Sequence, residues 1–267
     1  VTESRFFNPM GIVEEFSRTV RKELDFTEEA RNAARFRRNF EDYPDVCIPM
    51  IFTEFLTEKV LVMERLEGVR IDDIAAIEYL ELDRKELARI GVDAYFKMTL
   101  EDGFFHADPH PGNIFAMPSG QVGFMDFGIV GRVTDEMREA MANTFVALIG
   151  KDFDKLIEQY IELGLVPDEL DLDVFRKEFK ADLVDFLEPF FGITLKEINF
   201  GLYLETVIRL AIKHNLKIPF DLLLINKAML ILENLGVLLD PDFDFIRDDP
   251  RFKALVGETT DGQRING

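Results

Sequence analysis

Three polar side chains, Asp108, Asn113 and Asp126, have the spacing that magnesium-assisted phosphoryl transfer uses. Asn113 follows Asp108 by five positions, and Asp126 comes thirteen positions later, directly before Phe127-Gly128. In sites of this pattern the first Asp accepts or orients the proton of the attacking hydroxyl, while the Asn and the second Asp hold Mg²⁺ against the nucleotide phosphates. We therefore predict Asp108 as the catalytic residue, and Asn113 and Asp126 as ligands of Mg²⁺ bound with ATP.

A β-hairpin is expected to bring the two metal ligands together. Residues 113–116 and 121–125 are short apolar runs, and Met-Pro-Ser-Gly between them has turn chemistry. Such a hairpin carries Asn113 into one strand and Asp126 out of the other, so the two side chains meet at one end. Carboxylate and carboxamide oxygens suit Mg²⁺, which completes its shell with water and phosphate oxygens.

Two alternative interpretations of this segment stay open. Asp108 and Asn113 are also consistent with turn capping, because Asp and Asn beside Pro and Gly are common in ordinary turns. His106, Asp108 and His110 are consistent with a transition-metal site, since alternating imidazole and carboxylate groups can converge on Zn²⁺ or Fe²⁺. Such a site would have few further ligands, because the chain has only one other histidine and one cysteine.

The segment before residue 40 adds acidic candidates. Apolar residues at helical spacing predict one helix over about 11–22 and a second over about 26–40. Asp25 and Glu28 have the spacing of a capping box at the start of the second helix, and Glu29 would lie in its first turn. Taken alone, these charges favour a solvated helix face, because Lys and Arg alternate with them.

The motif His-Ala-Asp-Pro-His-Pro-Gly-Asn at 106–113, followed by Asp-Phe-Gly at 126–128, resembles the AarF/UbiB family of atypical protein-kinase-like proteins. Lys-Glu-Leu-Asp-Phe-Thr-Glu-Glu-Ala-Arg-Asn-Ala from residue 22 resembles the same family, and the likeness spans residues 8–245. It implies an α+β protein-kinase-like fold, with a partial N-lobe of a short antiparallel sheet plus helices, and a large helical C-lobe. We place the lobes at 1–68 and 69–250, with a tail at 251–267.

The same resemblance implies a function and further site residues. The family is linked to ubiquinone, other prenyl-quinone or isoprenoid-lipid metabolism through ATP binding and hydrolysis, rather than to ordinary protein phosphorylation. Glu29 would pair with a strand lysine that binds the phosphates. Glu23 and Asp25 would lie beside the phosphates as the Glu-x-Asp element of the family.

The adenine of ATP is assigned to a segment that follows two predicted strands. Residues 46–55 and 59–64 read as strands with a turn between them. Their continuation at 63–67 resembles a kinase hinge, whose backbone groups hydrogen-bond the adenine edge. We therefore place Glu64 and Leu66 at the adenine.

The rest of the chain is predicted to be helical. A buried helix over 83–102 leads to the catalytic segment, and five more follow Asp-Phe-Gly, over about 134–150, 152–164, 171–188, 195–214 and 219–236. No Ala-Pro-Glu follows Asp-Phe-Gly, and the predicted helix begins within a few residues of it. The long activation segment that docks a protein substrate is therefore not expected, which favours a small-molecule substrate or plain ATP hydrolysis. The apolar faces of these helices predict core, with a lipid or isoprenoid groove as the alternative.

Composition limits the partners and the compartment. With 31 Lys and Arg against 51 Asp and Glu, the net charge is −20, which disfavours nucleic acid and anionic membrane surfaces. A single cysteine excludes an intramolecular disulfide and fits a reducing compartment. We expect a protein of the cytoplasm or the periphery of the inner membrane. The expected partners are ATP and an isoprenoid or quinone-precursor lipid. Association with a membrane or a biosynthetic complex would use segments outside this sequence.

Some elements that the resemblance implies are not in the sequence. It contains no Gly-rich or Ala-rich phosphate loop, no strand lysine ahead of the Glu29 helix and no Lys-x-Gly-Gln. We expect residues upstream of Val1 to supply them, which would complete an ATPase. The alternative is a nucleotide-sensing scaffold or lipid-presenting protein that binds without turnover.

Overall fold

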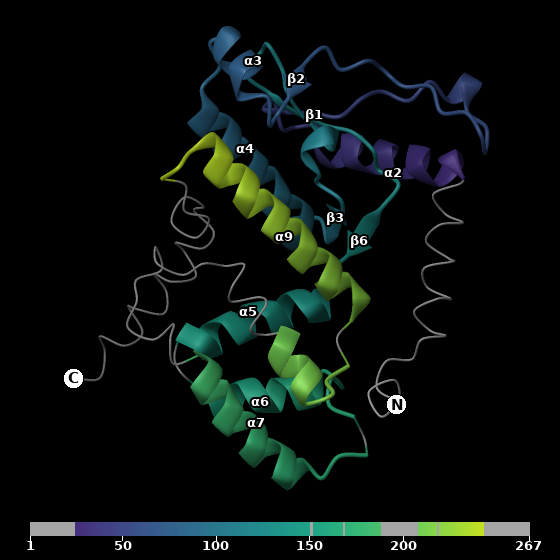
Figure 1. Cartoon of the computed structure of the whole chain (residues 1–267). Helices are drawn as coiled ribbons and strands as arrows, with labels where there is room; N and C mark the ends of the chain where they lie inside the picture. Colours follow the sequence, from purple (N-terminus) through teal and green to yellow (C-terminus); the bar gives the residue numbers. More distant parts are fainter. Residues whose placement is uncertain (1–24, 150–151, 168, 188–207, 218, 243–267) are drawn as a thin grey trace, which may run out of the picture. The chain divides into compact units, whose positions relative to one another are not determined.

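The computed structural model describes residues 25–149, 152–167, 169–187, 208–217 and 219–242 (Figure 1). The chain forms two compact units, Val1–Arg132 with Asn234–Phe243, and Val133–Glu233 with Asp244–Gly267. The expected lobes at 1–68 and 69–250 are those of a protein kinase, and their boundary differs from that of the two compact units. The lobes stay a prediction. Glu23 and the helix expected over 11–22 lie outside the described residues.

A four-stranded sheet in the first unit contains the predicted hairpin. Its strands run in the order β1 (Val46–Cys47), β5 (Val122–Phe124), β4 (Ile114–Ala116) and β2 (Val69–Arg70). β4 and β5 pair antiparallel, with Ile114 opposite Phe124, while β1 joins β5 in parallel. The hairpin between the two expected metal ligands is thus confirmed.

A second, two-stranded sheet carries the segment before the catalytic loop. β3 (Phe104–His106) pairs antiparallel with β6 (Val130–Arg132), and all three residues of β3 are buried. Gly131 lies under the ring of Phe105, where an added Cβ would be 2.1 Å from Phe105 Cζ. Only glycine therefore fits at this point of β6.

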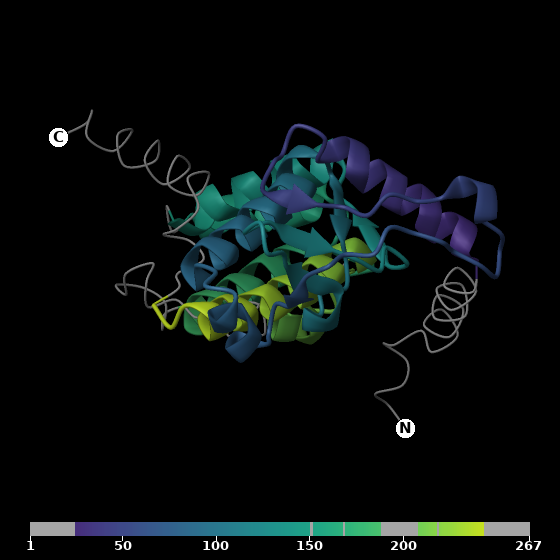
Figure 2. The ribbon, with the colours of Figure 1, turned by 90° about the horizontal axis from the view of Figure 1, so that it is seen from above.

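Helix α2 (Phe26–Asn39) confirms the second N-terminal helix and lies beside β3 (Figures 1 and 2). The side chain of Asp25 caps it by accepting a hydrogen bond from Thr27 N at 2.9 Å. The predicted capping box does not form, because the N–H of Glu28 donates to the backbone oxygen of Asp25 and the Glu28 side chain pairs with Arg31. The buried residues of α2 are Ala30, Ala33 and Phe36, and the ring of Phe36 packs 4.8 Å from that of Phe104.

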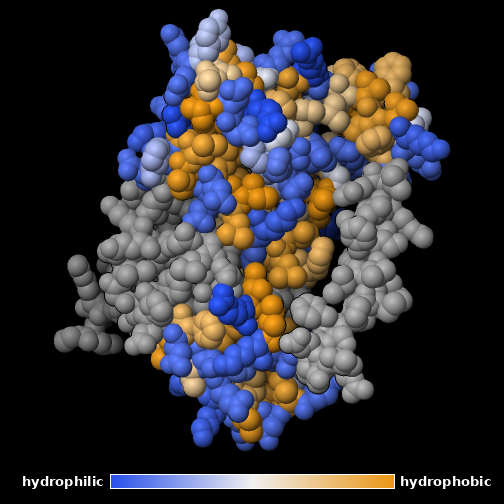
Figure 3. Space-filling view, viewed as in Figure 1, coloured by the Kyte–Doolittle hydropathy of each residue, from blue (hydrophilic) through white to orange (hydrophobic). Residues whose placement is uncertain are grey.

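The prediction of two strands between residues 46 and 64 needs correction. Only Val46–Cys47 joins a ladder, residues Thr53–Phe55 form a 3₁₀ turn, and the hairpin is closed by isolated bridges at Ile51–Met63 and Thr57–Val60. Pro49 has no N–H to donate to a ladder. The far end of the hairpin is also exposed, with Phe55 58% and Val60 48% accessible, so burial adds little to strand pairing there (Figure 3).

Helix α4 (Arg84–Phe96) and the π-helical turn η3 (Lys97–Glu101) occupy the place of the helix expected over 83–102. The short helix α3 (Ile74–Tyr79) was not predicted. Asp83 caps α4 by accepting from the N–H groups of Lys85 and Glu86. The turn η3 ends just before β3, so α4 delivers the chain to the catalytic segment.

The second unit is helical, as predicted. Helices α5 (Asp135–Ile149), α6 (Phe153–Glu162) and α7 (Leu172–Leu187) precede α9 (Phe220–Leu239), whose last residues belong to the first unit. The helix expected over 195–214 lies mostly outside the described residues, although 208–213 is helical. The core of this unit contains Ala147, Leu156, Ile157, Val166, Phe175, Phe179, Leu183 and Leu210.

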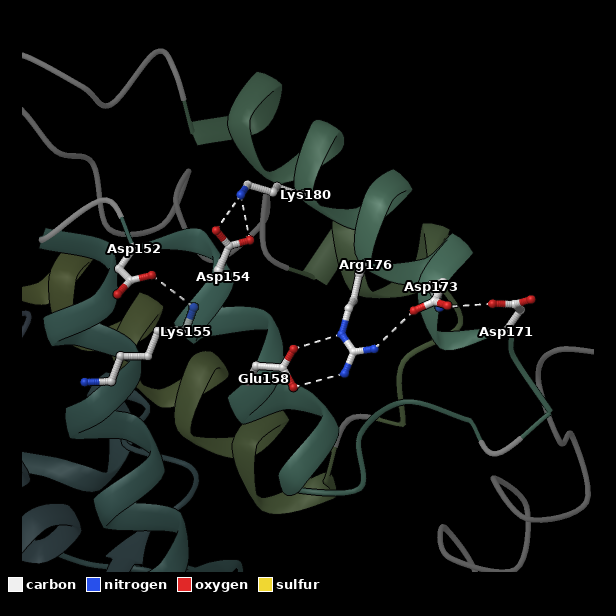
Figure 4. Close-up of polar contacts among 8 residues, drawn as sticks. All are labelled: Asp152, Asp154, Lys155, Glu158, Asp171, Asp173, Arg176 and Lys180. Carbon is white, nitrogen blue, oxygen red and sulfur yellow. Dashed lines mark hydrogen bonds and ion pairs between the residues drawn. The ribbon is translucent and has the colours of Figure 1, made fainter.

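Exposed ion pairs join α6 to α7 (Figure 4). The guanidinium of Arg176 binds both oxygens of Glu158, at 2.8 and 3.1 Å, and Lys180 binds both oxygens of Asp154 at 2.6 Å. Exposed pairs of this kind contribute about 1 kcal/mol or less each. They therefore add little to the stability of the unit.

Candidate active site

The end of the β4–β5 hairpin brings Asn113 and Asp126 together. Beyond the last ladder pair, the N–H of Met125 donates to the backbone oxygen of Asn113 at 2.8 Å. Asp126 is the next residue, so the two predicted metal ligands lie at adjacent strand ends. A carboxylate and a carboxamide placed in this way fit Mg²⁺, which takes few protein oxygens.

The loop from Asp108 to Asn113 is closed by its own hydrogen bonds. The backbone oxygen of Asp108 accepts from the N–H of His110 at 2.7 Å and from Nδ2 of Asn113 at 3.1 Å. Pro111–Asn113 form a 3₁₀ turn, and Nδ1 of His110 accepts from the N–H of Gly112 at 3.1 Å. Asn113 therefore does cap the turn, and it does so with its carboxamide nitrogen. Its carboxamide oxygen, the atom with which a carboxamide binds Mg²⁺, is not used in that bond.

His106 is fully buried and joins this loop to the strand before Asp126. Its Nδ1 accepts from the N–H of Asp108 at 3.3 Å, which places the ring proton on Nε2, and Nε2 donates to Met125 O at 3.0 Å. Both ring nitrogens are thus used within the protein. In the described part of the chain no three His, Cys, Asp or Glu side chains gather as a metal site. The transition-metal alternative for His106, Asp108 and His110 is not supported.

Asp126 has a left-handed backbone, with φ of +61°. Its side chain is exposed, and Oδ1 accepts from the N–H of Gly128 at 3.3 Å. A non-glycine residue in this region costs about 1–3 kcal/mol and persists only where its surroundings enforce it. Such strain is concentrated at functional sites, which agrees with the predicted role of Asp126.

Helix α2 also contacts the segment that contains Asp126 and Phe127. Burial raises the pKa of Glu29, the negative charge of Asp126 raises it further, and a hydrogen bond from the N–H of Phe127 opposes both effects. Asn32, one turn along, donates from Nδ2 to the backbone oxygen of Phe127 at 2.9 Å. Within the described residues Glu29 has no ion pair with a Lys or Arg, so its pairing with a lysine stays a prediction.

Asp25 acts as a helix cap. Its carboxylate accepts from Oγ1 of Thr27 at 2.6 Å as well as from the Thr27 N–H, and these bonds lower the pKa of Asp25. The structure therefore confirms that Asp25 caps the start of an ordinary helix. A place beside the phosphates remains a prediction for Asp25, as it does for Glu23.

The predicted adenine residues lie after the 51–63 hairpin. The N–H of Glu64 donates to Met50 O at 2.8 Å, so this group is used within the hairpin. Leu66 is buried, and an added Cβ at Gly123 in β5 would lie 2.9 Å from Leu66 Cδ1. Contacts between the backbone of residues 63–67 and adenine stay a prediction. Because the N–H of Glu64 is already bonded to Met50 O, Glu64 would have to contact adenine through another group.

Two residues of the site were missed or misassigned from the sequence. The sequence pattern assigns no role to Asn32, although a polar residue three positions after Glu29 falls on the same face of a helix. The same pattern offers His106 only as a metal ligand. Its position two residues before Asp108 was the available signal, since an imidazole can accept from a nearby backbone N–H and donate elsewhere.

Comparison with known proteins places these features in a family. Residues 1–160 match the ABC1 atypical kinase-like domain, and residues 183–244 match the UbiB helical domain. The chain is 36% identical over 270 residues to the probable protein kinase UbiB of Pseudomonas fluorescens (strain Pf0-1), covering 96% of this chain and 50% of that protein. It is 38% identical over 248 residues to the protein of the same name from Aeromonas hydrophila, covering 91% and 45%. The chain thus spans about half the length of these relatives.

A solved structure is similar in fold. The complex of Rv3197 with erythromycin from Mycobacterium tuberculosis aligns with a TM-score of 0.55 and 22% sequence identity, covering 93% of this chain and 61% of that one. Together with the domain match, this likeness confirms the predicted α+β, kinase-like fold.

Proposed function

The chain belongs to the UbiB family of ABC1 atypical kinase-like proteins, and from this premise we propose that it binds Mg²⁺-ATP and transfers or hydrolyses the terminal phosphoryl group. The observation that supports this most directly is the meeting of Asn113 and Asp126 at the end of the β4–β5 hairpin, with Asp108 bonded to Asn113 through its backbone. These are the three groups that the chemistry needs in one place.

Each residue has a role in the proposed reaction. The carboxylate of Asp108 accepts or orients the proton of the attacking hydroxyl or water. The carboxamide oxygen of Asn113 and the carboxylate of Asp126 would hold Mg²⁺. When bound, the metal would neutralise charge that develops on the phosphate oxygens. His106 keeps the loop of Asp108 in register with the strand before Asp126, through bonds to Asp108 N and Met125 O.

The substrate is proposed to be a small molecule rather than a protein. After Gly128 the chain passes directly into β6 (Val130–Arg132) and then α5, which begins at Asp135. This leaves no long segment on which a protein substrate would dock. The resemblance to the AarF/UbiB family implies a link to ubiquinone or other isoprenoid-lipid metabolism, and we propose a quinone precursor or other isoprenoid lipid as the substrate class.

Association with a membrane surface or a biosynthetic complex is part of the same proposal. Among the described helices, α9 alone has the length and apolar composition of a membrane span, a test that core helices of soluble proteins also pass. Several of its apolar residues are exposed, Phe220, Leu223, Val237 and Leu238. These exposed apolar side chains support a peripheral contact with lipid.

The experiment is Mg²⁺-dependent ATP hydrolysis, measured on the 267-residue chain and on a chain lengthened to the extent of its relatives. Asp126→Ala should abolish turnover, whereas Asp42→Ala, an exposed Asp after α2, should leave it unchanged. Equal turnover in the parent and Asp126→Ala would refute the assignment.

A scaffold that binds nucleotide without turnover is the second candidate. It is favoured by Glu29, which has no cationic partner in the part of the chain that the structure describes. Asp108→Asn separates the two, because it should remove the in vivo function of an enzyme and spare that of a scaffold.

A further inference from the structure

One face of α2 makes two different contacts with Phe127, the residue after Asp126. Asn32 donates from Nδ2 to its C=O at 2.9 Å, and the ring of Phe36 lies 4.9 Å from its ring. Positions 32 and 36 are four residues apart, so they share one side of the helix. We call these two side chains the Phe127 clamp.

The clamp acts on Asp126 through the backbone. The peptide group before Asp126 is held at Met125 O by the buried ring of His106. The residue after it is held at its backbone oxygen by Asn32 and at its ring by Phe36. Because the chain is tied on both sides of Asp126, its left-handed backbone, with φ of +61°, persists.

We infer that Asn32 is a positioning residue for the metal ligand Asp126: its carboxamide ties the Phe127 backbone to α2 and thereby holds Asp126 in its left-handed conformation. No comparison or motif assigns a role to this residue. The Mg²⁺ part of the inference rests on the proposed function, whereas the clamp itself does not.

The chemistry of the site explains why this position holds an Asn. The two carboxylates at this point, Glu29 and Asp126, already repel each other. A Lys or Arg at 32 could donate to Phe127 O but would add a long charged chain. An Asp would turn an acceptor toward the carbonyl oxygen. Asn supplies a neutral donor, although it is a weaker helix former than Ala or Leu.

The test compares Asn32→Asp and Asn32→Leu with Asn39→Asp, the same change at the last residue of α2. Amide hydrogen exchange at Phe127 is followed by NMR without nucleotide, with Phe124 in β5 as the internal reference. Exchange at Phe127 should become at least tenfold faster in both Asn32 variants and stay unchanged in Asn39→Asp, while Phe124 keeps its protection. With ATP present, the Asn32 variants should need about tenfold more Mg²⁺ for half-saturation, with unchanged affinity for ATP alone.

Unchanged exchange at Phe127 in both Asn32 variants would overturn the inference. So would an equal loss of protection at Phe127 and Phe124, because that would mean general destabilisation rather than release of the clamp. If the parent itself fails to bind Mg²⁺-ATP, the proposed function fails, and the exchange data alone still decide the role of Asn32.

Discussion

The buried imidazole of His106 donates to the backbone oxygen of Met125 at 3.0 Å, nineteen residues along the chain. Because its other nitrogen accepts from Asp108 N, one side chain connects the predicted catalytic residue with the strand that carries Asp126. The ring also packs 5.6 Å from that of Phe127. His106 is therefore both a core residue and the link between the two halves of the site.

Replacing His106 by Phe should keep the packing and remove both hydrogen bonds. Two backbone groups would lose their partners, each at a cost of about 1–3 kcal/mol if it stays buried. We expect a lower free energy of unfolding in urea and a loss of Mg²⁺-dependent turnover larger than stability alone explains. His106→Gln, which can restore one of the bonds, should fall between the parent and His106→Phe. Parent-like turnover in His106→Phe would contradict the linking role.

The raised pKa of Glu29 predicts that the stability of the fold depends on pH. Its pKa is raised in the folded state, first by burial and then by the charge of Asp126, so the charged carboxylate opposes folding. That opposition is present at pH values above the raised pKa and disappears as the pH falls below the ordinary value of 4.5. Glu29→Gln, in EDTA, should thus raise the melting temperature at pH 7 and have less effect at pH 4.

The control for this measurement is Glu28→Gln, one position earlier and on the exposed side of α2. It removes the same charge without removing the partly buried carboxylate near Asp126. A gain in melting temperature at pH 7 that is equal for the two variants would mean that general charge repulsion, rather than the site, is responsible.

Local signals in the sequence were enough for α2 and for the hairpin at Asn113. Asp25 as a cap and helical spacing of apolar residues predict the helix, and two apolar runs around a Pro-Ser-Gly turn predict the hairpin. Because the hairpin places its own ends together, it also accounts for the meeting of Asn113 and Asp126. This part of the site follows from residues that are close in sequence.

Contacts between distant segments could not be predicted in this way. Asn32 and Phe127 are 95 residues apart, and nothing near Asn32 in the sequence indicates which carbonyl it binds. The two-residue strand Val46–Cys47 exists because β5 lies beside it, and its extension was overpredicted where Pro49 and solvent exposure end the pairing. Pairing partners, rather than the local pattern, decide such strands.

In the second unit, Asp182 forms hydrogen bonds with Lys213 at 2.7 Å and His214 at 2.5 Å. The bond to Lys213 is the main cause of its lowered pKa, and the bond to His214 adds to it. A lowered carboxyl pKa stabilises the fold above the ordinary value of 3.8, and this contribution is lost as the pH falls through the lowered pKa.

Asp182→Asn should consequently cost on the order of 1 kcal/mol at pH 7, since a neutral amide replaces a charge-assisted acceptor that is partly exposed. The difference from the parent should shrink when unfolding is measured below pH 4. Asp173→Asn is the matched control, because Asp173 is 97% exposed and lies 3.6 Å from Arg176 in the same unit. A larger loss in the control would argue against a special role for Asp182.

The ion pair of Lys97 and Asp102, joined at 2.7 Å, spans the π-helical turn before β3. Only 11% of the Lys97 side chain and 14% of the Asp102 side chain are exposed, and Nζ of Lys97 also lies 5.0 Å from the ring centroid of Phe40. Among the residues that the structure describes, Oδ2 of Asp102 has no hydrogen-bond partner. Lys97→Met should therefore leave a buried charge uncompensated and lower the free energy of unfolding by about 3–5 kcal/mol.

The double variant Lys97→Met with Asp102→Leu provides the control. Replacing a buried ion pair by apolar groups of similar size is often neutral or stabilising, so the double variant should recover most of the lost stability. Urea unfolding of the parent, both single variants and the double variant gives the coupling energy as a double-mutant cycle. A double variant as unstable as Lys97→Met would show instead that the contact of Lys97 with Phe40, which both variants lose, stabilises this turn.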